Sequence, residues 1–116
     1  MIHQDSIFLA DKPLDKTSFD IVALFKREFQ LKKIGHSGTL DPKATGLLIL
    51  CSGKKTKLIN EFIDYDKEYN GIIRIGATTP TFDTESEEEN LTETESVTDE
   101  MIEKIKEKFT GDIEQI

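Results

Sequence analysis

Residues 35–46, with the sequence GHSGTLDPKATG, have the composition of a loop that could carry reactive side chains. His36 and Asp41 stand there among three glycines, small hydroxyl residues and one proline. Glycine lets the backbone adopt positive φ and approach a ligand closely, so three glycines predict a shaped surface. Pro42 biases Asp41 toward an extended backbone. The segment therefore predicts a loop that holds a carboxylate and an imidazole between two apolar runs.

Several kinds of chemistry could use such a loop. Ser37 beside His36 would suit a nucleophile and its base, but no G-x-S-x-G elbow surrounds the serine. A metal site would need three or four ligands, and the two histidines and one cysteine of the chain have no recognised spacing. Asp41 could act alone as a nucleophile or general base, because carboxylates form covalent intermediates at sugar carbons. It could equally cap a turn through its own backbone, and the residues alone leave both roles open.

Charge is distributed unevenly along the 116 residues, although the whole chain carries a net charge of −8. Residues 1–60 hold ten Lys and Arg against six Asp and Glu, whereas residues 61–116 hold five against seventeen. A phosphate-binding face could therefore lie in the first half of an acidic chain. The alternative is that these cations only solvate a surface.

Cysteine usage and hydropathy indicate the compartment. The single cysteine, Cys51, lies in the apolar run at residues 47–51, which favours a small buried residue over a nucleophile. A lone cysteine fits a reducing compartment. The first residues do not resemble a signal peptide, and no apolar run is long enough to span a bilayer. We expect a cytoplasmic protein with no membrane partner.

The pattern of apolar residues predicts three helices and about four strands. Apolar runs at 7–10 and 47–51 and the alternation at 69–75 predict strands. The Thr17–Ser18 pair and Thr98 are predicted to cap helices, and a further amphipathic helix is expected after Gly53. The predicted helices would bury Ile21, Val22, Phe25, Phe29, Leu58, Ile59, Phe62, Ile63, Ile102, Ile105 and Phe109. Residues 76–96 are acidic, without apolar periodicity, and are expected to form a mobile loop.

Several segments resemble the TruB-type pseudouridine synthases, a family whose relatives include dyskerin. Residues 35–42 with 44–46 are similar to the catalytic motif of that family. Further similarities to family segments lie at residues 11–13, 17–18, 66–69, 76–83 and 111–116. The resemblance implies an α/β (α+β) fold with a mixed, largely antiparallel sheet and flanking helices. Residues 1–116 would be the N-terminal portion of the catalytic domain.

The resemblance also implies roles for individual residues. These enzymes isomerise uridine 55 in the TΨC arm of tRNA, and Asp41 would be the catalytic aspartate that attacks C1′ of the ribose or C6 of the base. Tyr69 would stack on the flipped uracil, and His36 would fill the vacated place or contact the RNA backbone. Lys12 and Pro13 would buttress the loop rather than react. The loop residues Gly38, Thr39 and Leu40 would contact the substrate. Phosphate contacts are expected from among Lys12, Lys16, Lys32, Lys33, Lys43, Lys54 and Lys55.

The chain departs from the family pattern in its length. Family members carry, further along, a basic residue that pairs with the catalytic aspartate and commonly a small RNA-binding domain, and neither is in these 116 residues. The chain alone is therefore expected to be weakly active or inactive, with tRNA as partner and no metal or organic cofactor. The alternative is a non-catalytic RNA- or protein-binding module that keeps the synthase fold.

Overall fold

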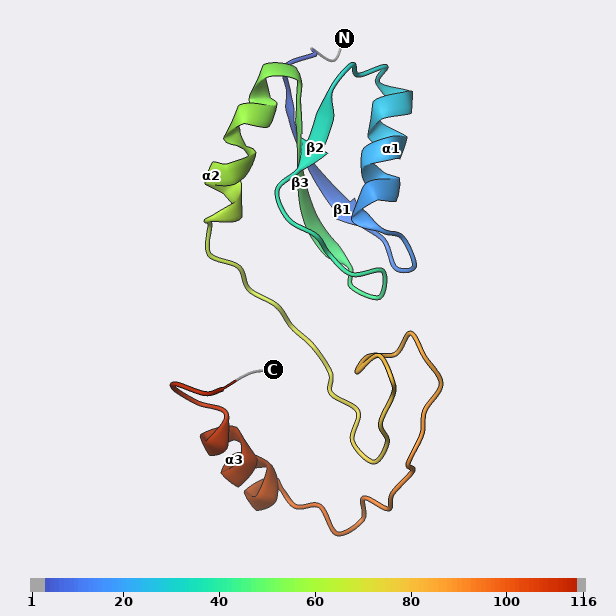
Figure 1. Cartoon of the computed structure of the whole chain (residues 1–116), viewed down its shortest axis with the longest axis vertical. Coiled ribbons are helices and arrows are strands. Elements are labelled where there is room, and N and C mark those ends of the chain that lie inside the picture. Colours follow the sequence, from blue (N-terminus) through green and yellow to red (C-terminus); the bar gives the residue numbers. More distant parts are fainter. Residues whose placement is uncertain (1–3, 115–116) are drawn as a thin grey trace. The chain divides into compact units, whose positions relative to one another are not determined.

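An antiparallel sheet with strand order β1-β3-β2 organises the first of two units in the chain (Figure 1). The structure is a computed structural model that describes residues 4–114. The first unit, Met1–Asn70, contains β1 (Ile7–Lys12), α1 (Ser18–Glu28), β2 (Ile34–His36), β3 (Gly46–Ser52), the 3-10 helix η1 (Gly53–Leu58) and α2 (Ile59–Ile63). The second unit, Gly71–Ile116, contains α3 (Asp99–Lys108).

Strand β3 is central because its nearly continuous apolar run is sheltered by neighbours on both sides. It pairs with β1 from Ile7 opposite Cys51 to Lys12 opposite Gly46. Strand β2 pairs with the other edge of β3 over three residues. The predicted strands at 7–10 and 47–51 are confirmed. Strand β2 was not predicted, and it takes the first two residues of the predicted loop.

Helix α1 covers one face of this sheet. The alternation along β1 turns Phe8, Ala10 and Lys12 toward the helix side, where Ala10 and Lys12 are buried. A core of buried residues forms there from Ala10, Ile21, Val22, Leu48 and Leu50. Three phenylalanine rings extend this core, since the Phe8 ring centroid lies 5.3 Å from that of Phe25 and 5.6 Å from that of Phe29. The predicted burial of the α1 face is confirmed for Ile21 and Val22.

The opposite face of the sheet is covered only in part. A Cβ atom placed on Gly35 would lie 3.0 Å from Ile59 Cδ1, so α2 packs closely over this end of the sheet. Cys51 is fully buried as predicted, and burial raises the pKa of its thiol. Further along the same face Leu9 and Leu47 are 71% and 63% exposed. This face therefore presents apolar surface to solvent.

A capping box begins α1 where it was predicted. The Thr17 hydroxyl accepts from the Asp20 backbone N–H at 3.0 Å, and the Asp20 carboxylate accepts from the Thr17 N–H at 2.8 Å. These hydrogen bonds, first that from the Thr17 backbone, lower the pKa of Asp20 below its ordinary value. The first turn of the helix therefore depends on an ionised Asp20.

Replacing Asp20 with asparagine should make the thermal midpoint of the first unit less sensitive to acid. A carboxyl whose folded pKa is lowered stabilises fully above the ordinary aspartate pKa of about 3.9, and this contribution is lost as the pH falls through the lower folded value. Circular dichroism melts between neutral pH and the acid range would show a smaller loss for Asp20→Asn than for the exposed control Asp66→Asn. Equal losses in the two variants would contradict the assignment.

Two sequence predictions are wrong: the continuous helix after Gly53 and the strand at residues 69–75. The helix expected after Gly53 is split into η1 and the five-residue α2, with Leu58, Ile59 and Phe62 half-buried and Ile63 43% exposed. Residues 69–75 form no strand, and Ile72 and Ile73 are 100% and 90% exposed. Within residues 4–114 no strand pairs with this segment, so its backbone groups lack the ladder that would make it a strand.

The second unit is mostly irregular. Residues 76–96 contain one isolated antiparallel bridge, between Thr78 and Glu89, and the Thr92 N–H donates to the Gly76 carbonyl at 2.8 Å. Helix α3 begins at the predicted N-cap, where the Thr98 hydroxyl accepts from the Met101 N–H. Its predicted apolar face is exposed rather than buried, with Ile105 at 55% and Phe109 at 70%. Within the described residues no helix is long and apolar enough to cross a membrane.

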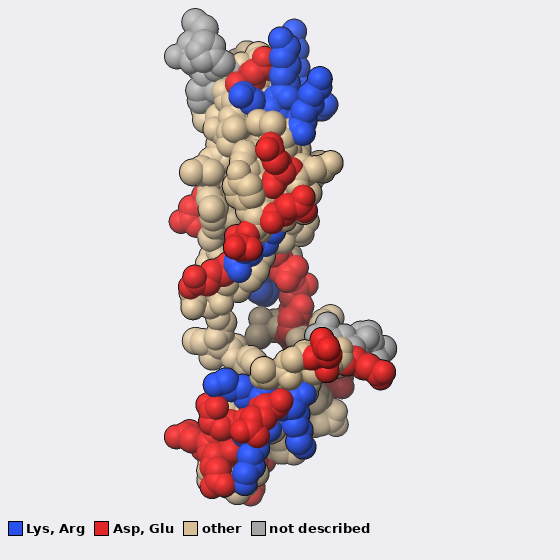
Figure 2. Space-filling view, turned by 90° about the vertical axis from the view of Figure 1, so that its left-hand side faces the viewer, with Lys and Arg blue, Asp and Glu red and all other residues tan. Residues whose placement is uncertain are grey.

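Positive charge gathers at one end of the first unit, where Figure 2 shows lysine and arginine side chains close together. This end is formed by the chain before β2 and by η1, which follows β3. Residues 30–35 and Gly53–Leu58 hold five lysines and no carboxylate.

Candidate active site

The loop between β2 and β3 is held to the body of the first unit by its backbone. The buried Ser18 hydroxyl, at the start of α1, donates to the Leu40 carbonyl at 3.1 Å and accepts from the Leu40 N–H at 2.9 Å. The Asp15 N–H donates to the Pro42 carbonyl at 2.8 Å. The residues on either side of Asp41 are therefore fixed, although most of the loop is exposed.

Lys12 is the interior support of this loop. Its side chain is fully buried, and its ammonium donates to the carbonyls of Lys16, Pro13 and Pro42 at 2.5, 3.0 and 3.3 Å. Three donors meet three acceptors, so the ammonium has no donor left for a ligand. This geometry supports the predicted role of Lys12 as a buttress and does not favour its predicted phosphate contact.

Asp41 presents its carboxylate to solvent. The residue is exposed, and among residues 4–114 its side chain forms no hydrogen bond and no ion pair. Its backbone carbonyl accepts from the Ala44 N–H at 3.0 Å, which closes the turn without the carboxylate. The structure thus does not show the alternative in which the Asp41 side chain caps its own turn. The carboxylate is open to an incoming substrate.

His36 ends β2 and folds back onto the loop. Its ring Nδ1 lies 2.7 Å from the Gly38 carbonyl oxygen and 3.3 Å from the Gly38 nitrogen, and the residue is half-buried. Gly38 has φ +146°, a backbone region that favours glycine. Thr39 is exposed and Leu40 is half-buried. The imidazole is therefore oriented by the same glycine that shapes the loop.

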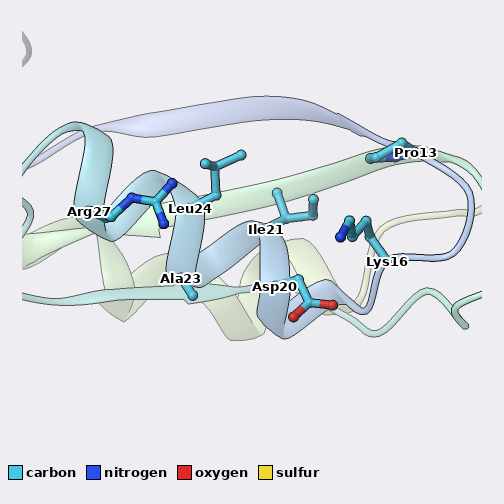
Figure 3. A pocket seen from close by; sticks show the side chains of 7 residues that line it. All are labelled: Pro13, Lys16, Asp20, Ile21, Ala23, Leu24 and Arg27. Atoms are coloured by element: carbon cyan, nitrogen blue, oxygen red, sulfur yellow. The ribbon is translucent and has the colours of Figure 1, made fainter.

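Two of the predicted phosphate contacts lie near the loop. The Lys43 ammonium forms an ion pair with the Asp15 carboxylate at 2.7 Å, and both side chains are partly exposed. Lys16 lines an open hollow of about 330 Å³ beside α1 (Figure 3). The hollow is bounded by Pro13, Lys16, Asp20, Ile21, Ala23, Leu24 and Arg27. Asp41 does not line it, so the hollow is separate from the Asp41 carboxylate.

The structure places two other predicted site residues elsewhere. Lys54 lies in η1, at the end of β3 opposite the loop, and its backbone N–H donates to the Asp5 carboxylate at 2.7 Å. Tyr69 follows α2 in a segment without regular structure and is 69% exposed. Neither contacts Asp41, and the role of Tyr69 stays a prediction. Within the part of the chain that the structure describes, no three potential metal ligands gather.

Ser18 and Asp15 were missed by sequence reasoning. The Ser18 hydroxyl bonds Leu40, whereas the predicted role of the Thr17–Ser18 pair was helix capping. Asp15 has φ +60°, and it contacts the loop with both its N–H and its carboxylate. The position of a serine directly after an N-cap does not predict a hydrogen bond to a residue 22 positions away. These contacts arise from the tertiary arrangement.

Replacing Ser18 with alanine should lower the free energy of unfolding of the first unit by about 1–2 kcal/mol, because the Leu40 N–H and carbonyl both lose a buried partner. Urea denaturation followed by circular dichroism would measure the loss. The exposed control Ser96→Ala should change it by less than about 0.5 kcal/mol. A Ser18 variant as stable as the control would show that the Leu40 contacts are not holding the loop.

Comparison with known proteins agrees with the geometry of the loop. Residues 26–116 match the family described as TruB family pseudouridylate synthase (N terminal domain). The chain is 46% identical over 116 residues to the tRNA pseudouridine synthase B of Parabacteroides distasonis, covering 95% of this chain and 49% of the relative. It is 54% identical over 98 residues to that of Chlorobaculum tepidum, covering 81% and 41%. For that of Phocaeicola vulgatus the identity is 45% over 119 residues, covering 97% and 51%.

The chain thus spans about half the length of the curated relatives it matches. The family match includes the whole loop from β2 to β3 and extends to residue 116. Together, the matched sequence and the exposed aspartate on an anchored loop lead to one conclusion: this chain belongs to the TruB family of pseudouridylate synthases and carries its N-terminal domain.

Proposed function

We propose that this chain carries the nucleophile loop of a tRNA pseudouridine synthase, with a uridine of the TΨC arm, position 55, as the target. One observation supports the proposal most. In a chain of this family, Asp41 is exposed and without a side-chain partner among residues 4–114, while its neighbours Leu40 and Pro42 are hydrogen-bonded to the body of the unit. A carboxylate in a fixed position can be directed at one substrate atom without a reorganisation cost.

The reaction exchanges one bond for another. Attack by the Asp41 carboxylate on C1′ of the ribose, or on C6 of the base, releases the bond between N1 and C1′. The uracil then rotates, C5 bonds to C1′, the bond from the Asp41 carboxylate to the substrate breaks, and the proton on C5 is lost while N1 gains one. Atoms and electrons balance within the substrate, so the proposed isomerisation requires no redox cofactor. The carboxylate serves as a transient nucleophile.

The target uridine must leave its stack before Asp41 can reach it. Extrusion of a base costs a few kcal/mol, and stacking on an aromatic side chain returns roughly 1–3 kcal/mol. We assign that stacking to Tyr69 and assign to His36 the place vacated by the base or a contact with the RNA backbone. The exposure of Tyr69 leaves its ring accessible to a base. A protein with this substrate would act in the cytoplasm, where tRNA is modified.

A chimaera tests the function of the chain without knowledge of any further sequence. In it, this chain replaces the matched region of the Parabacteroides distasonis protein, to which it is 46% identical over 116 residues. Pseudouridine in a tRNA transcript is then measured at position 55 and elsewhere. We expect conversion of that uridine by the chimaera and weak or no conversion by the 116-residue chain alone.

The alternative of a non-catalytic binding module predicts a different result. A module of that kind would give a folded chimaera that binds tRNA with a steep salt dependence but forms no pseudouridine. Conversion at a uridine outside the TΨC arm would instead reject the assigned position while retaining the reaction. Folding of the chimaera is checked by circular dichroism, so that a misfolded protein is not mistaken for an inactive one.

A further inference from the structure

Five lysines lie together at the end of the first unit that is opposite the catalytic loop. Lys32 and Lys33 precede β2, and Lys54, Lys55 and Lys57 lie in η1. We call these five residues the lysine end. Two backbone contacts join its segments: the Gly53 N–H donates to the Lys33 carbonyl at 2.9 Å, and Ile34 pairs with Ser52 across the sheet.

The backbone of the lysine end is anchored while its side chains are exposed. The Lys32 N–H donates to Gln4 Oε1 at 3.0 Å, and the Lys54 N–H donates to Asp5 Oδ1 at 2.7 Å. All five lysines are exposed, and their region of positive charge is visible at the top of Figure 2. The ammonium groups therefore extend into solvent from a surface that does not need to reorganise.

The Asp5 carboxylate lies at the lysine end but accepts from the Lys54 backbone N–H rather than from an ammonium group. Among residues 4–114 none of its five ammonium groups forms an ion pair. The lysines of α3 differ, since Lys104 pairs with Glu100 at 2.8 Å and Lys106 with Glu103 at 3.1 Å. A concentrated positive surface on a chain of net charge −8 favours a polyanionic partner.

The distance to the catalytic loop follows from β3. The loop enters β3 at Gly46, and η1 follows Ser52, which lies six residues further along the strand. At about 3.4 Å per residue, these ends are about 20 Å apart. The lysine end therefore lies about one strand length from the point where the loop enters β3. A ligand that contacts both the loop at this end of β3 and the lysine end would have to be an extended polyanion.

We propose that the lysine end is a second RNA-contact surface, which binds phosphates of the folded tRNA at the end of β3 opposite Gly46. This inference rests on the proposed function for the identity of the RNA. Lysines without interleaved aromatic residues suit the sugar–phosphate backbone rather than base edges, so the surface would position the RNA without reading its sequence. The predicted phosphate contact of Lys54 then belongs to this surface and not to the catalytic loop.

The test compares two triple variants of the 116-residue chain that change the net charge equally. Lys33→Gln/Lys54→Gln/Lys55→Gln alters the lysine end, and Lys104→Gln/Lys106→Gln/Lys108→Gln alters α3. Fluorescence anisotropy gives the tRNA affinity over a series of salt concentrations. The first variant should lower the slope of log K against log salt by about one per lysine removed, with about a tenfold loss of affinity at moderate salt. The α3 variant should leave the slope within one unit of the unsubstituted chain.

A second RNA tests whether the lysine end and the loop that carries Asp41 are separate binding surfaces. A short single-stranded oligoribonucleotide with the sequence of the target loop should be bound almost equally by the unsubstituted chain and by the lysine-end variant, because it does not reach that surface. Four results would each overturn the proposal. The tRNA salt slope of the lysine-end variant could be unchanged, or this variant could lose equal affinity for both RNAs. The two triple variants could have equal effects, or the unsubstituted chain could fail to bind tRNA. The Asp41→Asn variant should keep the full salt slope of tRNA binding. A failure of the catalytic proposal would be seen in a different measurement, as pseudouridine formation that survives this substitution.

Discussion

Replacing Lys12 with methionine is expected to lower the free energy of unfolding of the first unit by about 3 kcal/mol. Methionine fills a similar volume but cannot donate a hydrogen bond. The carbonyls of Pro13, Lys16 and Pro42 would lose the buried ammonium that they share. Charge-assisted hydrogen bonds contribute roughly 1.5–3 kcal/mol each, and the cost of burying the ammonium offsets part of that sum.

Urea denaturation of the 116-residue chain would measure this effect, with Lys26→Met as the control. Lys26 is exposed on α1, so its substitution should change stability by less than about 0.5 kcal/mol. Hydrogen exchange gives an independent readout, because the Asp15 N–H that bonds Pro42 should exchange faster in the Lys12 variant. If the Lys12 and Lys26 variants were equally stable, the interior support assigned to Lys12 would be rejected.

The burial of Lys12 could have been predicted from the period of β1. Residues two apart on a strand share a face, so Phe8 and Ala10 facing the core place Lys12 there as well. The predicted strand ended at residue 10, so the sequence did not place Lys12 on that face, and lysine is a residue type that is rarely buried. What resolves the conflict is the three backbone carbonyls, which come from segments that only the fold brings together.

The local signals in the chain gave reliable predictions where the partner was also local. The Thr17 cap needs only Asp20 three residues later, and the apolar run of β3 is buried between its two neighbours. Strand β2 gave no signal because three residues are too few to show a period. The alternation at residues 69–75 indicated a strand, but an alternating segment becomes a strand only when another strand pairs with it.

In the candidate site, too, local features could be predicted from the sequence and distant contacts could not. The composition of residues 35–46 predicted a shaped loop and left the role of Asp41 open, the resemblance to the family implied its reactive role, and the structure places that loop on anchored backbone. The residues that anchor it, Ser18 and Asp15, could not be found because each acts through a contact 22 or more residues away. Lys54 was predicted as a phosphate contact together with Lys12, Lys16 and Lys43, and β3 carries it to the end of the sheet opposite the loop.

Replacing Asp41 with asparagine is expected to lower pseudouridine formation by the chimaera at least about a thousandfold. Asparagine keeps the size of the side chain and removes the nucleophilic carboxylate. Since the Asp41 side chain has no partner among residues 4–114, the substitution breaks no contact in the described structure and should leave stability unchanged within about 0.5 kcal/mol. A loss of activity in a variant of unchanged stability then points to chemistry rather than to folding. Asp64→Asn, at an exposed carboxylate outside the loop, serves as the matched control.

The most direct test of the account is the single-turnover rate of pseudouridine formation, measured for the chimaera and for its Asp41→Asn variant at saturating protein. Binding of the same tRNA is measured alongside by anisotropy. The account predicts that the variant binds tRNA within about threefold of the unsubstituted chimaera while its rate falls at least about a thousandfold. A variant that forms pseudouridine at a rate within about tenfold of the unsubstituted chimaera would contradict the assignment of Asp41 as the nucleophile.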